Sequence, residues 1–201
     1  MHDCRGIGFI CWLHLLLCAC TPLTDPATVH DKVFVFGTFS GTEDGLDVVR
    51  TPTKEFGWLA DEVKIQFVWL DGRSWPWITA PVNRSGYFSA MLPRGRYFVN
   101  VRMPNRQVYL NHAFSAEEKG KAHYLGHLDL DITRRFVFLA LGACTYGSVD
   151  KFSVRDESST SMKWLTVDAR GKIYAEVVKS LLAPTAEANA PSVDYDCGFL
   201  K

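Results

Sequence analysis

The feature that most constrains this chain is a period-two alternation of apolar and polar residues, which recurs between residues 33 and 141. Successive side chains of a β-strand point to opposite faces, so this period indicates half-buried strands. Gly, Pro, Asn and Asp separate the segments, and no helix-length periodic segment divides the early ones. The pattern predicts a mainly β chain with an antiparallel β-sandwich over residues 32–150, and it argues against βαβ units.

The individual segments predict which side chains share a face. Residues 33–36 (VFVF) are apolar at every position, as expected for a strand in the interior of a sheet, and 135–141 (RFVFLAL) is a further apolar run. Alternation predicts strands at 63–69 and at 97–101. A further strand is predicted at 123–130, in which one face carries Tyr124, Leu128 and Leu130 and the other carries His123, His127 and Asp129.

Residues 86–101 (GYFSAMLPRGRYFVNV) carry a more specific pattern of two strands and a turn. The turn is Pro93-Arg94-Gly95, in which Pro fixes φ and Gly takes the left-handed position. The apolar positions are Phe88, Ala90 and Leu92 before the turn and Tyr97, Val99 and Val101 after it. The pattern resembles the hairpin of carboxypeptidase regulatory-like, or transthyretin-like, β-sandwich domains. Tyr124-Leu125-Gly126 fits a later strand of such domains in bacterial envelope lipoproteins. The resemblance implies a transthyretin/Ig-like sandwich and says little about activity.

The period changes after residue 150. Asp156 can cap a short helix that runs through Ser161 to Leu165. Apolar residues then recur at helical spacing from Ile173 to Leu182, and Pro184 stops the run. We therefore expect a helical extension over 151–184 that packs on the sandwich, followed by a tail over 185–201.

The first residues are typical of an export signal. Residues 7–19 (IGFICWLHLLLCA) form an apolar run that follows Arg5, and the run is too short to span a bilayer. Leu17-Cys18-Ala19-Cys20 resembles the lipobox of bacterial lipoproteins. This resemblance implies that cleavage follows Ala19 and that Cys20 carries diacylglycerol and an amino-terminal acyl chain. A plain secretory signal is the alternative.

This interpretation divides the amino-terminal region into a signal peptide over 1–19 and a lipidated tether over 20–31, which contains two prolines and no apolar period. Two or three acyl chains give stable membrane anchoring. Thr21 follows Cys20, and resemblance to Gram-negative lipoproteins then implies the periplasmic face of the outer membrane.

Export also changes which cysteines remain available to form a disulfide. Cys4, Cys11 and Cys18 leave with the signal and Cys20 is lipidated, so the folded part retains only Cys144 and Cys197. An even pair in an oxidising compartment predicts a disulfide. Two free thiols are the alternative.

Composition and motifs exclude several functions. Lys plus Arg and Asp plus Glu both total 22, so the chain has no net charge, and a neutral chain is a poor candidate for nucleic-acid binding. The chain contains no nucleophile elbow, P-loop or dinucleotide fingerprint, and we expect no cofactor. Glu43, Asp44 and Asp47 lack the spacing of a calcium loop.

The segment between residues 112 and 131 offers weak candidates for chemistry. His123 and His127 would lie about 13 Å apart on a strand, too far for one metal ion, and we expect them, with His112, to be exposed. Asp129 and Asp131 would share a face about 7 Å apart, a spacing that permits acid–base chemistry but is common for solvated carboxylates.

The tryptophans of residues 69–77 (WLDGRSWPW) are the most suggestive feature. Trp75 and Trp77 flank Pro76 beyond the Asp71-Gly72 turn, and exposed indoles are costly without a function. They either bind a sugar or a protein partner, or they cover the end of the sandwich. We expect a non-enzymatic envelope lipoprotein that acts as a structural or protein-interaction module. A glycan-binding lipoprotein with an aromatic platform is the alternative, and a hydrolase has the least support.

Overall fold

A computed structural model describes residues 32–50, 62–70, 77–104, 106–139, 142–167, 176–185 and 190–195, without the side chains of 136–145, 166–167 and 195. By its internal contacts the chain divides into two units, Met1–Asp31 and Lys32–Lys201, and only the second contains described residues. Within the described ranges, no helix is long and apolar enough to cross a bilayer.

The described elements are strands with a single helix among them. In chain order they are β1 (Lys32–Glu43), β2 (Leu46–Asp47), β3 (Lys64–Trp69), β4 (Ile78–Pro81), β5 (Tyr87–Pro93), β6 (Gly95–Met103), β7 (Arg106–Ala116), β8 (Ala122–Leu139), β9 (Gly142–Arg155), α3 (Ser158–Val167), β10 (Val177–Lys179), β11 (Ala183–Pro184) and β12 (Ser192–Tyr195). They form two sheets, which confirms the predicted β-sandwich with a C-terminal helical segment.

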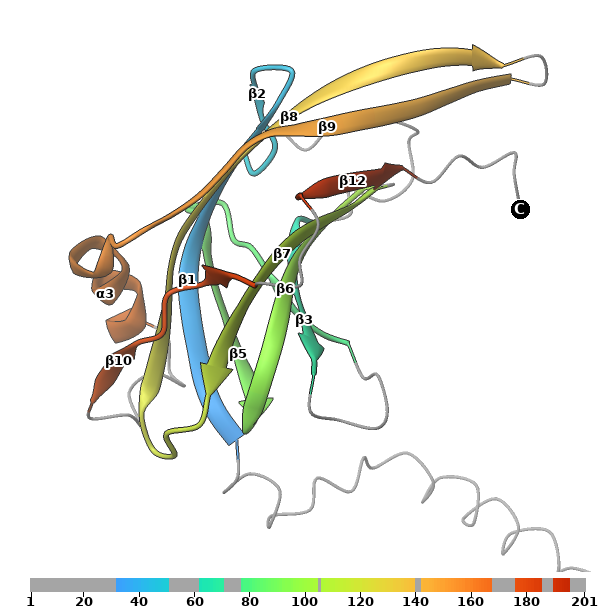
Figure 1. The fold of residues 1–201 in the computed structure, drawn as a ribbon. Helices are drawn as coiled ribbons and strands as arrows, with labels where there is room; N and C mark the ends of the chain where they lie inside the picture. Colours follow the sequence, from blue (N-terminus) through green and yellow to red (C-terminus); the bar gives the residue numbers. More distant parts are fainter. Residues whose placement is uncertain are drawn as a thin grey trace, which may run out of the picture. The chain divides into compact units, whose positions relative to one another are not determined.

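Sheet A is built on the pair of β1 and β8, which run parallel (Figure 1). Strand β1 also pairs antiparallel with β5 and β2, and β8 pairs antiparallel with β9 and parallel with β10. Beyond Ile132, the only described strand that pairs with β8 is β9.

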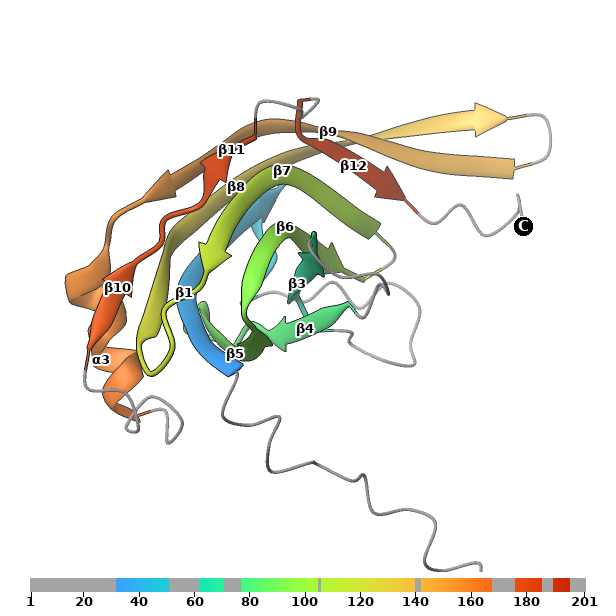
Figure 2. The same ribbon diagram turned by 60° about the horizontal axis from the view of Figure 1, so that its bottom comes forward.

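Sheet B has the order β4-β3-β6-β7, and both β11 and β12 pair with the free edge of β7. The C-terminal segment therefore leaves sheet A after β10 and joins sheet B at β11, with Leu182 buried in the core between them (Figure 2). Segment 177–184 thus links the two sheets along one side of the sandwich.

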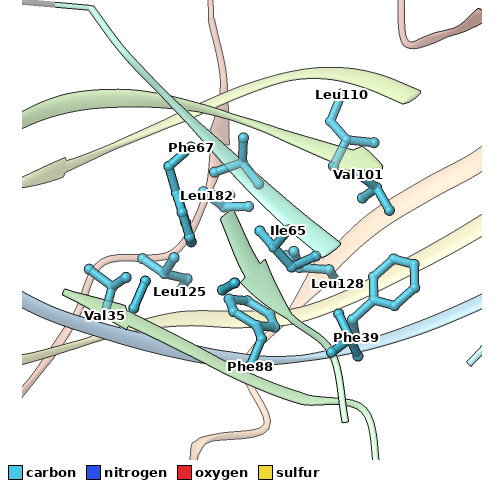
Figure 3. Close-up of a cluster of buried hydrophobic side chains, with 14 of the residues drawn as sticks. Val35, Phe39, Ile65, Phe67, Phe88, Val101, Leu110, Leu125, Leu128 and Leu182 are labelled. Atoms are coloured by element: carbon cyan, nitrogen blue, oxygen red, sulfur yellow. The ribbon is translucent and has the colours of Figure 1, made fainter. Parts of the chain in front are cut away.

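The core lies between the two sheets, and it contains the side chains that alternation predicted (Figure 3). Each of its main strands contributes every second residue: Val33, Val35 and Phe39 from β1, Ile65 and Phe67 from β3, Phe88, Ala90 and Leu92 from β5, and Tyr97, Val99 and Val101 from β6. These burials confirm the core faces that alternation predicts for β3, β5 and β6.

A second apolar cluster covers the outer face of sheet A. Phe34 and Phe36 point away from the main core and pack with Tyr87 and Tyr124 under Leu165 of α3. Both faces of β1 are therefore buried, as its uninterrupted apolar start predicts.

The predicted hairpin at 86–101 is wrong in its pairing. Strand β5 pairs with β1 in sheet A, whereas β6 pairs with β3 and β7 in sheet B, so Pro93-Arg94-Gly95 is a corner between sheets. The Tyr97 hydroxyl donates to the Pro93 carbonyl at 2.7 Å across this corner, and Gly95 has a φ of 146°. The sequence pattern predicts the strands and the turn correctly. It cannot predict the pairing, because a hairpin and a corner between two sheets bury the same alternate residues.

The predicted shared face of Tyr124 with Leu128 and Leu130 is also wrong. Phe36 is opposite Tyr124 but Thr38 is opposite His127, so β8 contains a bulge at this point. Tyr124 lies in the outer cluster, while Leu128 and Leu130 lie in the core. Gly126 makes this possible, because its φ of 105° is one that residues with a side chain rarely adopt.

The C-terminal prediction is partly correct. Helix α3 begins where expected, with the Asp156 carboxylate accepting from the Ser158 backbone N–H at 3.2 Å. The helix expected from Ile173 to Leu182 is wrong where it is described, because Val177 and Val178 lie in β10. Strand β9 pairs with β8 only from His127 onward, so the first residues of β8 present an open edge that this β-branched pair occupies.

Candidate functional site

Trp77 is the part of the predicted aromatic platform that the structure describes. It lies directly before β4, which pairs only with β3 among the described strands, and it is 60% exposed. Ala80 is in the core and Ile78 packs against it, so alternation places Trp77 and Thr79 on the outer face of sheet B. Trp75 lies outside the described residues.

The register of sheet B places polar side chains beside Trp77 on this outer face. Gln66 is opposite both Thr79 and Asn100, and Asn100 is opposite Tyr109. Gln66 is 2% exposed and accepts a hydrogen bond from Gln107 Nε2 at 2.6 Å. Tyr109 is 40% exposed, so two accessible aromatic side chains lie on this face with buried amides between their strands.

A cavity of about 420 Å³ lies at one end of the sandwich. This is the end where β1 finishes at Glu43, and Lys32 at the start of β1 lies at the other end (Figure 1). The walls come from strand ends and connections of both sheets, and the apolar wall consists of Leu46, Val48, Val49, Val63, Val82 and Met103. Connections on a rigid sandwich are a common place for binding sites, because they vary without disturbing the core.

A buried ion pair forms part of this cavity wall. Arg106 of β7 donates from Nη2 to Glu43 Oε2 of β1, and both side chains are almost fully buried. Arg106 also donates to the Pro104 carbonyl at 3.0 Å. The pair links sheet A to sheet B, and removing one partner would leave a buried charge, which is strongly destabilising.

Two other acids of the cavity, Asp44 and Asp47, also have specific partners. Asp44 accepts from the Arg134 backbone N–H at 2.9 Å and lies 3.5 Å from its Nε. Asp47 accepts from the backbone N–H groups of Val49 and Arg50 at 2.8 and 2.9 Å. These carboxylates are thus committed to arginines and backbone amides, and the described residues contain no cluster of His, Cys, Asp or Glu suited to a metal ion.

A second hollow of about 490 Å³ lies between the edge strands β4 and β5. Its lining includes Ile78, Tyr87, Met91 and Trp164, so α3 contributes to it as well. The Tyr87 and Trp164 rings lie 6.3 Å apart. This hollow is more apolar than the first and contains no charged lining residue among those described.

The histidines do not form a site together. His112 donates from Nδ1 to the Leu110 carbonyl at 2.7 Å, and its ring packs edge-on against Phe152. His123 is buried, contrary to the expected exposure, with its ring nitrogens 2.9 Å from Ser180 Oγ and 3.2 Å from the Glu118 carbonyl. The bulge at Gly126 then separates it from His127, which lies on the outer face of sheet A.

His127 is the centre of a polar network on that face. Its Nδ1 is 2.9 Å from Thr38 Oγ1 and its Nε2 is 2.9 Å from Ser40 Oγ. Ser40 donates to Asp129 at 2.9 Å, so Nε2–H donates to Ser40 and Nδ1 accepts from Thr38. Burial lowers the pKa of His127 despite the opposing charge of Glu157, which favours this neutral form.

The two carboxylates of β8 are held by hydroxyls rather than poised for catalysis. Burial would raise the pKa of Asp129, but the Ser40 hydrogen bond and the charges of Lys151 and Arg155 outweigh it and lower the pKa. Asp131 accepts from Thr42. A general acid needs a raised pKa, so Asp129 is unsuited to that role.

The predicted cysteine sites lie largely outside the described residues. This is true of Cys20, of Cys197 and of the side chain of Cys144, whose backbone is opposite Val137 in β9. Strand β12 pairs with β7 and ends at Tyr195, shortly before Cys197. Lipidation at Cys20 and the disulfide between Cys144 and Cys197 stay predictions.

The fold and its hollows define a β-sandwich with a charged cavity at one end. No family model and no curated protein matches the chain. It is similar to a DUF3823 family protein from Parabacteroides merdae ATCC 43184, known from a crystal structure at 1.80 Å resolution. The identity is 17%, the TM-score is 0.27, and the similarity covers 60% of this chain and 58% of that one, less than two thirds of its length. A likeness of this size adds nothing to the fold described above.

Proposed function

We propose that the chain is a non-enzymatic lipoprotein of the cell envelope, anchored through Cys20, whose sandwich binds a protein partner. The lipobox-like sequence supports the anchor, and the transthyretin-like pattern at 86–101 occurs in envelope lipoproteins. The proposed binding site for this partner is the cavity at the end of β1. This end lies opposite Lys32, the residue at which the sequence of the proposed tether joins the sandwich.

The lining of the cavity is the observation that carries this proposal. Aliphatic side chains form one wall, and arginines with carboxylates surround them. Such a pocket suits an apolar anchor side chain of a partner, since binding energy concentrates where such a residue is fully desolvated. Charges of both signs around it would select partners with a complementary pattern. Arg84 is exposed at this cavity and is well placed to contribute.

Site-specific photo-crosslinking in the native cell tests the proposal. The reactive group is placed at position 84, with a matched control at exposed Glu117, at the opposite end of the sandwich. We expect one dominant protein adduct at position 84 only, identified by mass spectrometry and lost with Cys20→Ala. Equal adducts at both positions, or none at position 84, would contradict binding at the cavity. Intact mass of the purified protein tests the anchor separately, since acylated Cys20 adds the mass of its acyl chains.

Glycan binding is a second candidate function, supported by the outer face of sheet B. Trp77 and Tyr109 are accessible on this face, and aromatic rings with amides between them suit stacked sugars. Titration with soluble oligosaccharides should then quench tryptophan fluorescence, and Tyr109→Ala should weaken the response. An unchanged spectrum over a broad panel of oligosaccharides would remove this candidate.

A further inference from the structure

Basic side chains collect at the end of the sandwich where the tether enters. The register places the start of β1, the corner between β5 and β6 and the connection between β7 and β8 at this tether end. Its basic residues are Lys32, Arg94, Arg96, Lys119 and Lys121. Arg94, Arg96 and Lys119 are exposed, so the tether end presents positive charge to the solvent.

The acids of the tether end only partly offset this charge. They are Glu117, Glu118 and Glu176, which leaves an excess of two positive charges among the described residues of these connections. Lys121 binds both Glu118, at 2.8 Å, and Glu176, at 3.0 Å. Two of the three acids therefore share one lysine as an ion-pair partner.

Trp77 lies close to the same end. Ile78 is opposite Phe67, so Trp77 precedes it at the level of Val68, one residue before β3 ends at Trp69. The indole is 60% exposed, which is unusual for the largest apolar side chain. Tryptophan beside Arg and Lys is typical of surfaces that meet a membrane interface, where the indole prefers to lie among the headgroups.

The short sequence between the proposed lipid anchor and the sandwich limits how far this end can lie from the bilayer. Residues 21–31 separate Cys20 from Lys32, and a stretch of this length spans at most about 40 Å when fully extended. A weak surface contact becomes effective at such a distance, because the tether makes the contact intramolecular.

We infer that the tether end of the sandwich rests on anionic phospholipid headgroups, with Trp77 at the interface and Arg94 and Arg96 facing the lipid phosphates. This inference rests on the proposed lipid anchor and adds a second membrane contact to it. The contact would orient the sandwich so that the cavity at the far end of β1 faces away from the bilayer.

Tryptophan quenching by brominated lipids tests the contact in the full lipidated protein. The protein is reconstituted in vesicles of phosphatidylethanolamine and phosphatidylglycerol, or of phosphatidylcholine alone, each containing brominated phosphatidylcholine. We expect Trp77→Phe to remove most of the quenching. The double variant Arg94→Gln/Arg96→Gln should reduce quenching in anionic vesicles to the level in neutral ones, while Arg84→Gln at the other end leaves it unchanged.

Two outcomes would overturn the inference without touching the anchor. Quenching that is equal in the wild type, Trp77→Phe and the double arginine variant would show that this surface does not meet lipid. Quenching that is equal in anionic and neutral vesicles for the wild type would exclude headgroup charge as the partner. Intact mass reads out acylation of Cys20 independently, so a missing anchor is recognised as a failure of the proposed function. Circular dichroism melting checks that each variant is folded.

Discussion

The outer face of β1 changes character halfway along the strand. Phe34 and Phe36 in its first half are buried under α3 and aromatic neighbours, whereas Thr38 and Ser40 in its second half hydrogen-bond to the polar side chains of β8. This strand face is thus apolar beneath Leu165 of α3 and polar beyond it, where Thr38 Oγ1 lies 3.4 Å from Ser161 Oγ of the same helix. The comparison shows that the side chains packed on the strand, rather than the strand itself, decide what this face must contain.

A bulge marks the boundary between the halves. Gly37 and Gly126 meet there, and a Cβ on Gly37 would lie 2.8 Å from the Gly126 carbonyl oxygen and 2.7 Å from the Phe88 ring. The extra residue in β8 shifts its alternation, so Tyr124 faces the helix while His127 faces Ser40. The two halves therefore depend on glycine at these positions.

The largest effect is expected in the apolar half. Phe36→Ala removes a fully buried ring that packs on Phe34, Tyr87 and Tyr124. We expect a loss of about 3–5 kcal/mol in the free energy of unfolding, measured by urea denaturation of the folded domain. A loss below about 1 kcal/mol would show that the ring contributes little packing energy to this cluster.

The second largest loss of stability is expected at the bulge. Gly126→Ala places a Cβ 2.7 Å from Val154 Cγ1 at a φ of 105°, so strain and clash add together. We expect a loss of roughly 2–3 kcal/mol by the same measurement. Gly45→Ala is the matched control, because its φ of 79° is also positive but nothing lies within 4 Å of the new Cβ. Equal losses at both positions would mean that the crowding at the bulge contributes nothing.

The sequence predicts the apolar half of the outer face of β1 much better than its polar half. Uninterrupted apolar residues at 33–36 imply two buried faces, and alternation implies the core positions of β3, β5 and β6. The alternation does not specify which strands pair with one another. The sequence therefore predicts a hairpin at Pro93, where the structure has a corner, and a regular strand at Gly126, where the structure has a bulge. The cavity is invisible for a related reason: Glu43 and Arg106 lie far apart in the chain, and only the topology brings them together.

A smaller effect is expected in the polar half. Ser40→Ala removes the hydroxyl that joins His127 Nε2 to Asp129, with both contacts at 2.9 Å. The site is partly open to water, which can replace part of the loss, so we expect about 1 kcal/mol of destabilisation. Ser40→Thr retains the hydroxyl and serves as the control. A loss as large as that of Phe36→Ala would remove the contrast between the halves.

The smallest effect is a dependence of stability on pH in the polar half. Burial lowers the pKa of His127 in the folded protein, so the unfolded chain binds the proton more tightly. The stabilisation of the neutral ring is complete above the unfolded pKa of about 6.5 and is lost as the pH falls from that value through the lower pKa of the folded state. Unfolding free energies measured between pH 7.5 and 5 should therefore decline, and His127→Gln should flatten the decline. Asp129 acts in a separate window, because the stability that its lowered pKa provides is complete above its unfolded pKa of about 3.8 and is lost only in more acidic solutions. An unchanged slope in His127→Gln would assign the decline to another group, and the network around His127 would then be insensitive to its protonation.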